Sequence, residues 1–219
     1  MNKLGNVFSA IGILILLAAA LLTVHNIRDD NRAKATSEMV VAVLEDENVT
    51  APTVPQNAPD ETVHQEQTQS VSADTTEETI PDYALDPNRE MPVKKIDGKD
   101  YIGILEIPEI SITLPVMGEW DYPKLKDAPC RYSGSPYQDN LVIMAHNFQS
   151  HFGKIGKLSV GSRVTFTDLD DNVFTYQVAY TEVLEPTEVE DVTSGVWPLT
   201  LFTCTTGGQY RSVVRCELV

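Results

Sequence analysis

Three side chains in the carboxyl-terminal half of this chain have the types and spacing of a nucleophilic site. Cys204 closes a short apolar and threonine-rich run, and Arg211 opens the next run across Gly207-Gly208. His146 ends a third run, which is strongly apolar. A thiolate is a nucleophile, a nearby guanidinium favours thiolate over thiol, and imidazole transfers protons near neutral pH. The combination indicates acyl transfer through a thioester.

Three predicted strands must bring these side chains together. Gly207-Gly208 is a hairpin signal between two β-rich runs, and facing residue numbers in such a hairpin sum to roughly 415. Cys204 is then opposite Arg211. The apolar run that precedes His146 predicts a buried strand. A histidine after such a run is more often structural than catalytic, but the cysteine and arginine favour a catalytic role.

The same residues resemble the sortases, cysteine transpeptidases of the Gram-positive cell surface. Thr200-Leu-Phe-Thr-Cys204 is similar to their Thr-Leu-x-Thr-Cys signature, and Arg211 is followed by Ser-Val-Val as on their next strand. Residues 101–110 resemble the first strand of the sortase barrel, and residues 141–147 resemble the strand that ends at the catalytic histidine. The resemblance spans about residues 99–219 and leaves the sortase class open.

The resemblance implies a role for each residue. Cys204 is the nucleophile, His146 the general acid/base, and Arg211 the group that orients substrate and stabilises the tetrahedral intermediate. The bond cleaved follows Thr in a Leu-Pro-x-Thr-Gly-like sorting signal, and an amine of a peptidoglycan precursor or of a pilin resolves the thioester. The substrate-binding residues implied are Thr203, Ala145, Asn147 and Val192.

The fold predicted for residues 99–219 is mainly β. Apolar, β-branched runs separated by Pro, Gly, Asp and Asn predict strands over 103–117, 140–145, 163–167, 173–183, 199–204 and 211–219. One or two short helices are predicted, at 122–127 and 151–157. The resemblance implies that these strands form a closed eight-stranded sortase-type barrel.

The amino terminus predicts a membrane anchor. Residues 4–24 carry no charge and match the ~20 residues that cross the hydrocarbon as a helix. A cleaved signal peptide is the competing interpretation, because Ala18-Ala19-Ala20 offers small residues. We expect residues 1–3 to be a cytoplasmic tip and the protein to be a single-pass membrane protein that contacts lipid through residues 4–24. The extracytoplasmic position of the catalytic domain rests on the resemblance.

Residues 25–98 predict a disordered acidic linker. Their 16 acids and six bases account for ten of the sixteen excess negative charges, and apolar residues are sparse. Residues 33–46 could form a short helix that continues from the membrane segment, but their apolar residues are too clustered for a convincing amphipathic face. A long tether would allow the domain to work in the wall, away from the lipid. Residues 83–88 resemble the lid of pilin-building sortases, but Asn88 replaces the aromatic residue, so we interpret them as linker.

Other sites are less well supported. The sequence has no closely spaced Cys or His pairs of the kind that bind zinc. The acidic loop 185–195 has oxygen ligands that suit calcium, and acidic residues in this loop help to bind calcium in some sortases. We nevertheless predict no metal and no other cofactor. His151 is interpreted as a loop histidine. Cys130 and Cys216 are interpreted as small buried hydrophobes, with a disulfide between them as the alternative.

Two further functions remain open. A wall-exposed binding module on a membrane stalk would use Cys204, His146 and Arg211 only as structural residues. A pilin polymerase would use the same chemistry with a pilin amine as acceptor. No nucleic-acid partner is predicted for either.

Overall fold

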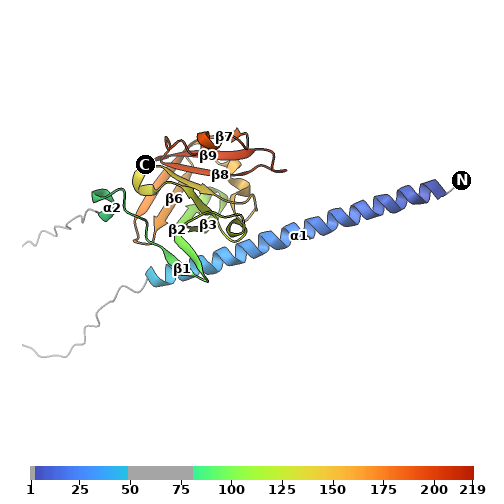
Figure 1. Cartoon of the computed structure of the whole chain (residues 1–219), viewed down its shortest axis with the longest axis horizontal. Coiled ribbons are helices and arrows are strands. Elements are labelled where there is room, and N and C mark those ends of the chain that lie inside the picture. The colour runs from blue at the N-terminus through green and yellow to red at the C-terminus, as the bar shows by residue number, and fades with distance from the viewer. Residues whose placement is uncertain (1–2, 49–80) are drawn as a thin grey trace, which may run out of the picture.

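The computed structural model of the chain describes residues 3–48 and 81–219, which form one long helix and a β-barrel (Figure 1). The helices are α1 (Lys3–Asn48), α2 (Asp82–Leu85) and α3 (Val189–Val192). The strands are β1 (Lys94–Ile96), β2 (Lys99–Ile107), β3 (Ile112–Met117), β4 (Cys130–Ser133), β5 (Leu141–Met144), β6 (Arg163–Asp168), β7 (Val173–Leu184), β8 (Leu199–Cys204) and β9 (Arg211–Leu218).

The barrel closes with eight strands. The sheet order is β1-β2-β3-β4-β5-β8-β9-β7-β6, and β6 pairs back onto β2. Strand β1 only extends the β2 edge as a hairpin. Closure brings β2 so close to β6 that a Cβ atom on Gly103 would lie 2.2 Å from the Thr167 carbonyl oxygen. The structure therefore confirms the predicted mainly β, closed eight-stranded barrel.

Several predicted elements change their bounds. The run 103–117 is two strands, because Pro108–Ile110 forms a 3₁₀ turn and Ser111 takes a left-handed conformation with φ 54°. Strands β1 and β4 were not predicted. The two predicted helices are 3₁₀ turns, at Lys124–Lys126 and Phe152–Lys157.

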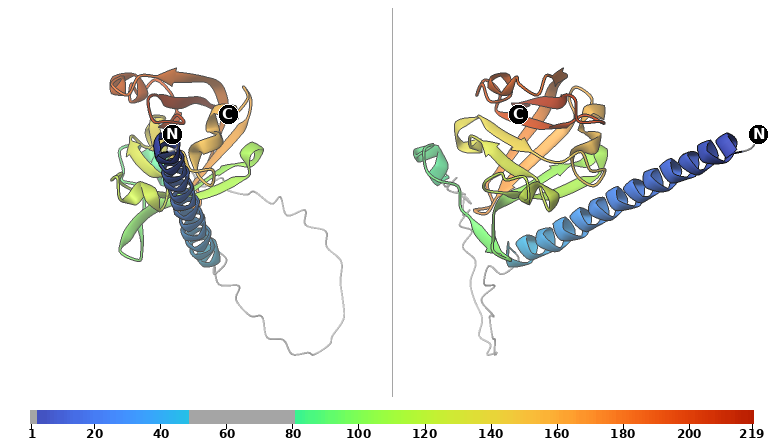
Figure 2. Two further views of the ribbon diagram at one scale, coloured as in Figure 1. Left: turned by 90° about the vertical axis from the view of Figure 1, so that its right-hand side faces the viewer. Right: turned by 45° about the vertical axis from the view of Figure 1, so that its right-hand side comes forward.

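Helix α1 corrects the predicted linker over residues 25–48. The helix runs without a break from the apolar segment to Asn48 and lies along the barrel beside β3 (Figure 2). Its buried positions follow the spacing i, i+4, i+7, i+8 and i+11, which is one helical face; they are Ala33, Ser37, Val40, Val41 and Leu44. Residues 30–44 of this helix are therefore a docking element. The predicted linker residues 49–80 lie outside the described part of the chain.

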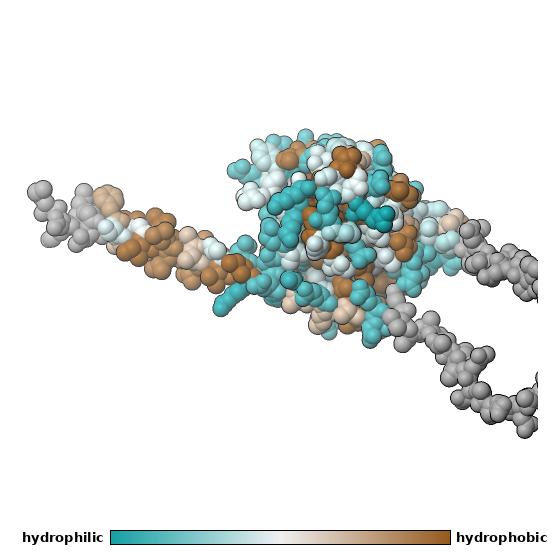
Figure 3. Space-filling view, turned by 180° about the vertical axis from the view of Figure 1, so that it is seen from behind, coloured by the Kyte–Doolittle hydropathy of each residue, from teal (hydrophilic) through white to brown (hydrophobic). Residues whose placement is uncertain are grey.

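The amino-terminal part of α1 extends away from the barrel. Its residues form a brown, apolar arm on the space-filling surface (Figure 3). Among the described residues, this is the one helix long and apolar enough to cross a membrane, with a mean hydropathy of 2.7 over its best window. At 1.5 Å per residue, Val24 and the docked Asp30 are roughly 9 Å apart along the axis. The barrel is thus held close to the apolar segment, which differs from the expected long tether.

Residues 82–91, predicted as linker, also dock on the barrel. The Tyr83 ring stacks on Tyr137 at a centroid distance of 5.0 Å and contacts Phe174 at 5.1 Å. Phe174 is near the start of β7, whereas Leu184 at the end of β7 pairs with Arg211. Ten residues of strand span roughly 33 Å. The segment therefore packs at the end of the barrel far from Arg211, and it does not cover Cys204 as a lid would.

His151 is another residue whose position differs from prediction. It is fully buried between α1 and the barrel, with its Nε2 atom 3.3 Å from the Ser37 hydroxyl oxygen. Burial lowers its pKa to about 4, against the smaller opposing effects of Asp30 and Asp127. The imidazole is consequently neutral in the folded protein at neutral pH, so it acts as an interface residue and not as an exposed loop histidine.

We expect this burial to make the docked fold acid-sensitive. Because the folded pKa is lower than the unfolded value of about 6.5, the unfolded chain binds the proton first, and stability falls as the pH drops from about 6.5 to about 4. The full loss in the free energy of unfolding is on the order of 3 kcal/mol. Denaturant unfolding of the full chain across this range should show a steeper loss for wild type than for His151→Gln. The matched control is His25→Gln on exposed α1; a His151 variant that follows wild type would contradict the prediction.

Candidate active site

The pairing of β5 with β8 brings the backbone at His146 to the strand end at Cys204. The two strands are parallel, with Val142 paired with Thr200 and Met144 with Phe202. Extending this register by two residues pairs position 146 with position 204. Strand β5 ends at Met144, and the loop that follows it carries His146.

Hydrogen bonds around the two residues join the strand ends. The Ala145 N–H donates to the Phe202 carbonyl at 3.2 Å, and the Thr203 hydroxyl donates to the Ala145 carbonyl at 2.8 Å. One residue further, the Asn147 side-chain amide donates to the Thr205 carbonyl at 3.3 Å. The residues on either side of His146 are thus bonded to the residues on either side of Cys204.

Arg211 lies on the other side of Cys204. Strands β8 and β9 are antiparallel, and Cys204 pairs directly with Arg211, which confirms the predicted register. The strand order β5-β8-β9 puts the thiol between the imidazole strand and the guanidinium strand. Arg211 Nη1 donates to the carbonyls of Gly208 at 3.4 Å and Tyr210 at 3.2 Å, which ties the side chain to its own turn.

The three cysteines differ in their surroundings. Cys130 and Cys216 are fully buried, and burial raises the pKa of each thiol to about 12. Cys204 is partly exposed, and all three cysteines are free thiols. The burial of Cys130 and Cys216 confirms their interpretation as small core residues and leaves the alternative disulfide unformed. Cys204 is therefore the cysteine that a reactant can reach.

His146 has the electrostatics of a proton acceptor. Its pKa is lowered, first by burial and then by the nearby positive charge of Lys126. The neutral imidazole is favoured at neutral pH, so it can take a proton from a thiol and pass it on. The Phe148 ring packs on the imidazole with a centroid distance of 5.1 Å.

Two depressions flank Cys204. A polar pocket of about 250 Å³ includes Cys204, Asn147, Gln149, Lys157 and Ser212 in its lining. A smaller hollow of about 30 Å³ lies toward α3 and is lined mainly by apolar groups, among them Tyr132, Val192 and Phe202, with Arg211 at its edge. The thiol thus lines the polar pocket, and its pairing partner Arg211 lines the largely apolar hollow.

The four predicted substrate-binding residues fall into two groups. Ala145 and Thr203 are 1% and 2% exposed, and Thr203 is also part of the lining of the polar pocket. Asn147 lines the polar pocket, and Val192 lines the apolar hollow. The last two keep positions from which a substrate could be contacted.

Arg215 is a further residue near the site, and its role was not predicted from the sequence. This buried arginine donates through Nε to a Glu182 carboxylate oxygen at 2.7 Å and through Nη2 to the Asp191 carbonyl at 2.8 Å. Its Nη1 donates to the Val192 carbonyl at 3.3 Å and the Thr200 hydroxyl at 3.1 Å. A lone arginine within the apolar run of β9 is the signal that could have revealed it. Arg215 fixes the loop that forms the wall of the apolar hollow.

The acidic loop before β8 was the candidate for calcium. In the described part of the chain, no group of three or more His, Cys, Asp or Glu side chains is arranged to hold a metal ion. The Glu188 carboxylate instead accepts a hydrogen bond from the Glu185 N–H at 2.6 Å. The Arg215 guanidinium meets this loop at the Asp191 and Val192 carbonyls.

Comparison with known proteins identifies the family. A model of the sortase domain matches residues 105–219, slightly more than half of the chain. A similar solved structure is a sortase D5 transpeptidase of Clostridium perfringens, which is 21% identical with a TM-score of 0.51 over 63% of this chain and 88% of that chain. Sortase C of Streptococcus pneumoniae, whose structure bears on pilin substrate specificity, is 25% identical with a TM-score of 0.50 over 57% and 70%.

The structural likeness to the Clostridium perfringens enzyme shows the shared fold, and the family match reaches from β2 to the carboxyl-terminal residue. No curated protein sequence matches the chain. The Cys204 strand, the Arg211 strand and the His146 strand all lie within the matched region. This chain belongs to the sortase family of cysteine transpeptidases.

Proposed function

We propose that the chain is a membrane-anchored sortase that uses Cys204, His146 and Arg211 to transfer a Leu-Pro-x-Thr-Gly-like sorting signal to a cell-wall amine. The observation that carries this proposal is the register that places Cys204 between the strand of His146 and the strand of Arg211. The apolar part of α1 supports a single-pass anchor, with the barrel on the extracytoplasmic side.

The first half of the reaction forms a thioester. His146 accepts the Cys204 proton while Sγ attacks the Thr carbonyl carbon, and Arg211 N–H groups stabilise the oxyanion. The C–N bond to Gly then breaks, and the imidazolium gives its proton to the leaving amine. The neutral resting state of His146 suits this sequence, since the proton it donates is the one it took from the thiol.

The second half resolves the thioester. An acceptor amine gives a proton to His146 and attacks the carbonyl carbon, and the thiolate leaves and is reprotonated from the imidazolium. The leaving and entering amines must both lie on the imidazole side of Cys204. The polar pocket that contains Asn147 and Lys157 lies next to the thiol and provides room for them.

The apolar hollow is our candidate for the Leu-Pro part of the signal. Val192, Phe202 and Tyr132 line it, and Arg211 lies at its edge, so the acyl half of the peptide would run from Cys204 over Phe202. A ring pair at a centroid distance of 5.3 Å joins Phe202 to Tyr132 and keeps that wall rigid. This role for Val192 agrees with the sequence-based expectation.

The acceptor proposed is a wall-precursor amine. Pilin-building sortases carry a lid over the active site, whereas residues 82–91 of this chain pack at the far end of the barrel through Tyr83. Transfer to a pilin amine is the alternative outcome of the test below.

The test is incubation of the full chain in detergent micelles with Leu-Pro-x-Thr-Gly-like and Asn-Pro-x-Thr-like peptides, with and without triglycine. Mass spectrometry should show an acyl adduct on Cys204 and, with the amine present, a new amide product. If no peptide gives an adduct and Cys204 resists alkylation in the folded state, the hypothesis of a wall-exposed binding module is favoured instead.

Arg215 gives a sharper prediction about the apolar hollow. Lysine at this position keeps the charge, but it cannot donate hydrogen bonds to Glu182, Asp191 and Val192 at the same time. The loop that forms the wall of the hollow is then held less firmly. We expect Arg215→Lys to raise KM for the sorting peptide about 10-fold with kcat little changed, because the hollow binds ground state and transition state alike. Steady-state kinetics against exposed Arg163→Lys provide the comparison. A lower kcat at constant KM would contradict this role.

A further inference from the structure

We propose that the docked part of α1 belongs to the catalytic machinery, with Asp30 and Ser37 as positioning residues that hold the loop following His146. This inference rests on the proposed function, because it assigns a support to the proposed general acid/base. It gives the helix next to the apolar segment a role beyond anchoring. The argument depends on three sets of contacts within residues 30–44 and 146–153.

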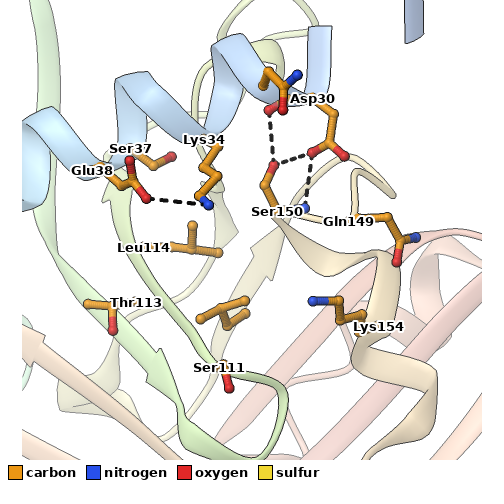
Figure 4. A pocket seen from close by; sticks show the side chains of 12 residues that line it. Asp30, Lys34, Ser37, Glu38, Ser111, Thr113, Leu114, Gln149, Ser150 and Lys154 are labelled. Carbon is orange, nitrogen blue, oxygen red and sulfur yellow. Dashed lines mark hydrogen bonds and ion pairs between the residues drawn. The ribbon is translucent and has the colours of Figure 1, made fainter. Parts of the chain in front are cut away.

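The first set binds the loop at Ser150. The Ser150 N–H donates to the Asp30 carboxylate at 3.0 Å, and the Ser150 hydroxyl donates to the same carboxylate oxygen in a short hydrogen bond (Figure 4). The hydroxyl also lies 3.3 Å from the Asp30 carbonyl oxygen. A carboxylate that accepts both a backbone and a side-chain donor fixes the backbone position of Ser150.

The second set binds the loop at His151. Ser37 Oγ lies 3.3 Å from His151 Nε2 and 3.3 Å from the Asp127 carbonyl oxygen, so one hydroxyl connects helix, loop and barrel. His151 is 0% exposed. A buried polar pair of this kind allows few alternative side-chain positions, because each lost bond leaves a desolvated polar atom.

The third set transmits these positions to His146. The Phe148 ring contacts both imidazoles, with centroid distances of 5.1 Å to His146 and 5.7 Å to His151. The backbone closes the loop on itself, since the Phe152 N–H donates to the His146 carbonyl at 3.2 Å. A Cβ atom on Gly153 would lie 2.7 Å from the carbonyls of Asn147 and Phe148. A loop packed this tightly moves as a unit.

Docking of the helix itself has separate supports. Val40 and Leu44 insert into the apolar cluster that includes Tyr101 and Met117, and Arg32 contacts the Asp127 carboxylate at 3.4 Å. Removal of the Asp30 carboxylate or the Ser37 hydroxyl should therefore leave α1 on the barrel while releasing the loop. The two roles of the helix can be separated by mutation.

The test compares full-length variants in lipid nanodiscs. We expect Asp30→Ala combined with Ser37→Ala to lower kcat about 10-fold at unchanged KM, because the imidazole spends less time aligned with the thiol. Asp30→Asn keeps an acceptor for Ser150 and should recover most of the activity. Glu45→Ala, which removes a carboxylate from an exposed position of α1, should match wild type. Val40→Ala should lower thermal stability with kcat retained.

A second measurement does not depend on turnover. Selective labelling of the four histidines allows the His146 ring to be titrated by NMR, with His146→Gln providing the assignment. Its titration midpoint should change in the double variant and stay unchanged in Glu45→Ala. An unchanged midpoint together with kcat within twofold of wild type would overturn the inference. If wild type has no transpeptidase activity, the proposed function fails, and the NMR result still decides whether α1 positions the loop.

Discussion

Replacement of Cys204 by alanine is expected to abolish both the acyl adduct and the amide product. The reaction proposed has no route that avoids the thioester, because the imidazole of His146 can move a proton but does not hold the acyl group. Loss of a catalytic nucleophile costs more than 10³-fold in rate in comparable enzymes, which leaves no product above background. Mass spectrometry of the full chain with peptide and triglycine measures both species.

The other two cysteines provide matched controls for this variant. Cys130→Ala and Cys216→Ala remove thiols whose pKa is raised to about 12 by burial, so they should change stability and leave turnover per folded molecule unchanged. Iodoacetamide should label wild type once in the folded state, at Cys204. Turnover that persists in Cys204→Ala, or an adduct on Cys216, would contradict the assignment.

The hairpin register is the part of the site that the sequence predicted best. A turn marked by Gly207-Gly208 connects two β-rich runs, so simple counting paired Cys204 with Arg211, as the structure confirms. Both glycines have left-handed φ values, 91° and 75°, which explains why this signal was readable. The pairing of β5 with β8 is different, because a parallel contact between distant segments has no local signature. The resemblance to sortases implied that both strands belong to one barrel, and the structure shows that they are neighbours.

Helix α1 shows why the docking of distant segments escaped prediction. The helical face that meets the barrel includes Ala33 and Ser37, which are too small or too polar to count in an apolar pattern. The conspicuous cluster of Met39, Val40, Val41 and Val43 instead suggested a helix without a clear face. Ser37 is buried because it has partners on the barrel, and those partners are more than eighty residues away in sequence.

Buried polar residues account for the remaining surprises. His151 was predicted to be a loop histidine, and no role was predicted for Arg215. In the structure both side chains are 3% exposed or less. The sequence gives no measure of burial for a single polar residue, since burial depends on which segments cover it. Each is explained only when α1 covers His151 and the loop before β8 covers Arg215.

Replacement of Arg211 is expected to give the second large loss of activity. Its Nη1 atom makes the two hydrogen bonds that the structure describes for this side chain, both to carbonyls of its own turn, Gly208 and Tyr210. A guanidinium has five N–H donors in a planar fork, so a fixed arginine can still present donors to the oxyanion of a substrate held at Cys204. We therefore expect Arg211→Ala to lower kcat/KM about 10³-fold and Arg211→Lys about 10²-fold.

The size of the effect and its distribution over the two half-reactions distinguish this role from a structural one. An oxyanion donor acts in acylation and in resolution of the thioester, so Arg211→Ala should slow the single-turnover rate of adduct formation and also the rate at which triglycine removes the adduct. Arg163→Lys on exposed β6 is the control and should behave as wild type. Melting temperature should change little in Arg211→Ala, because its guanidinium is bonded only to an exposed turn. A variant that loses less than threefold in both steps would leave Arg211 as a support of the hairpin and move oxyanion stabilisation to backbone N–H groups near Cys204.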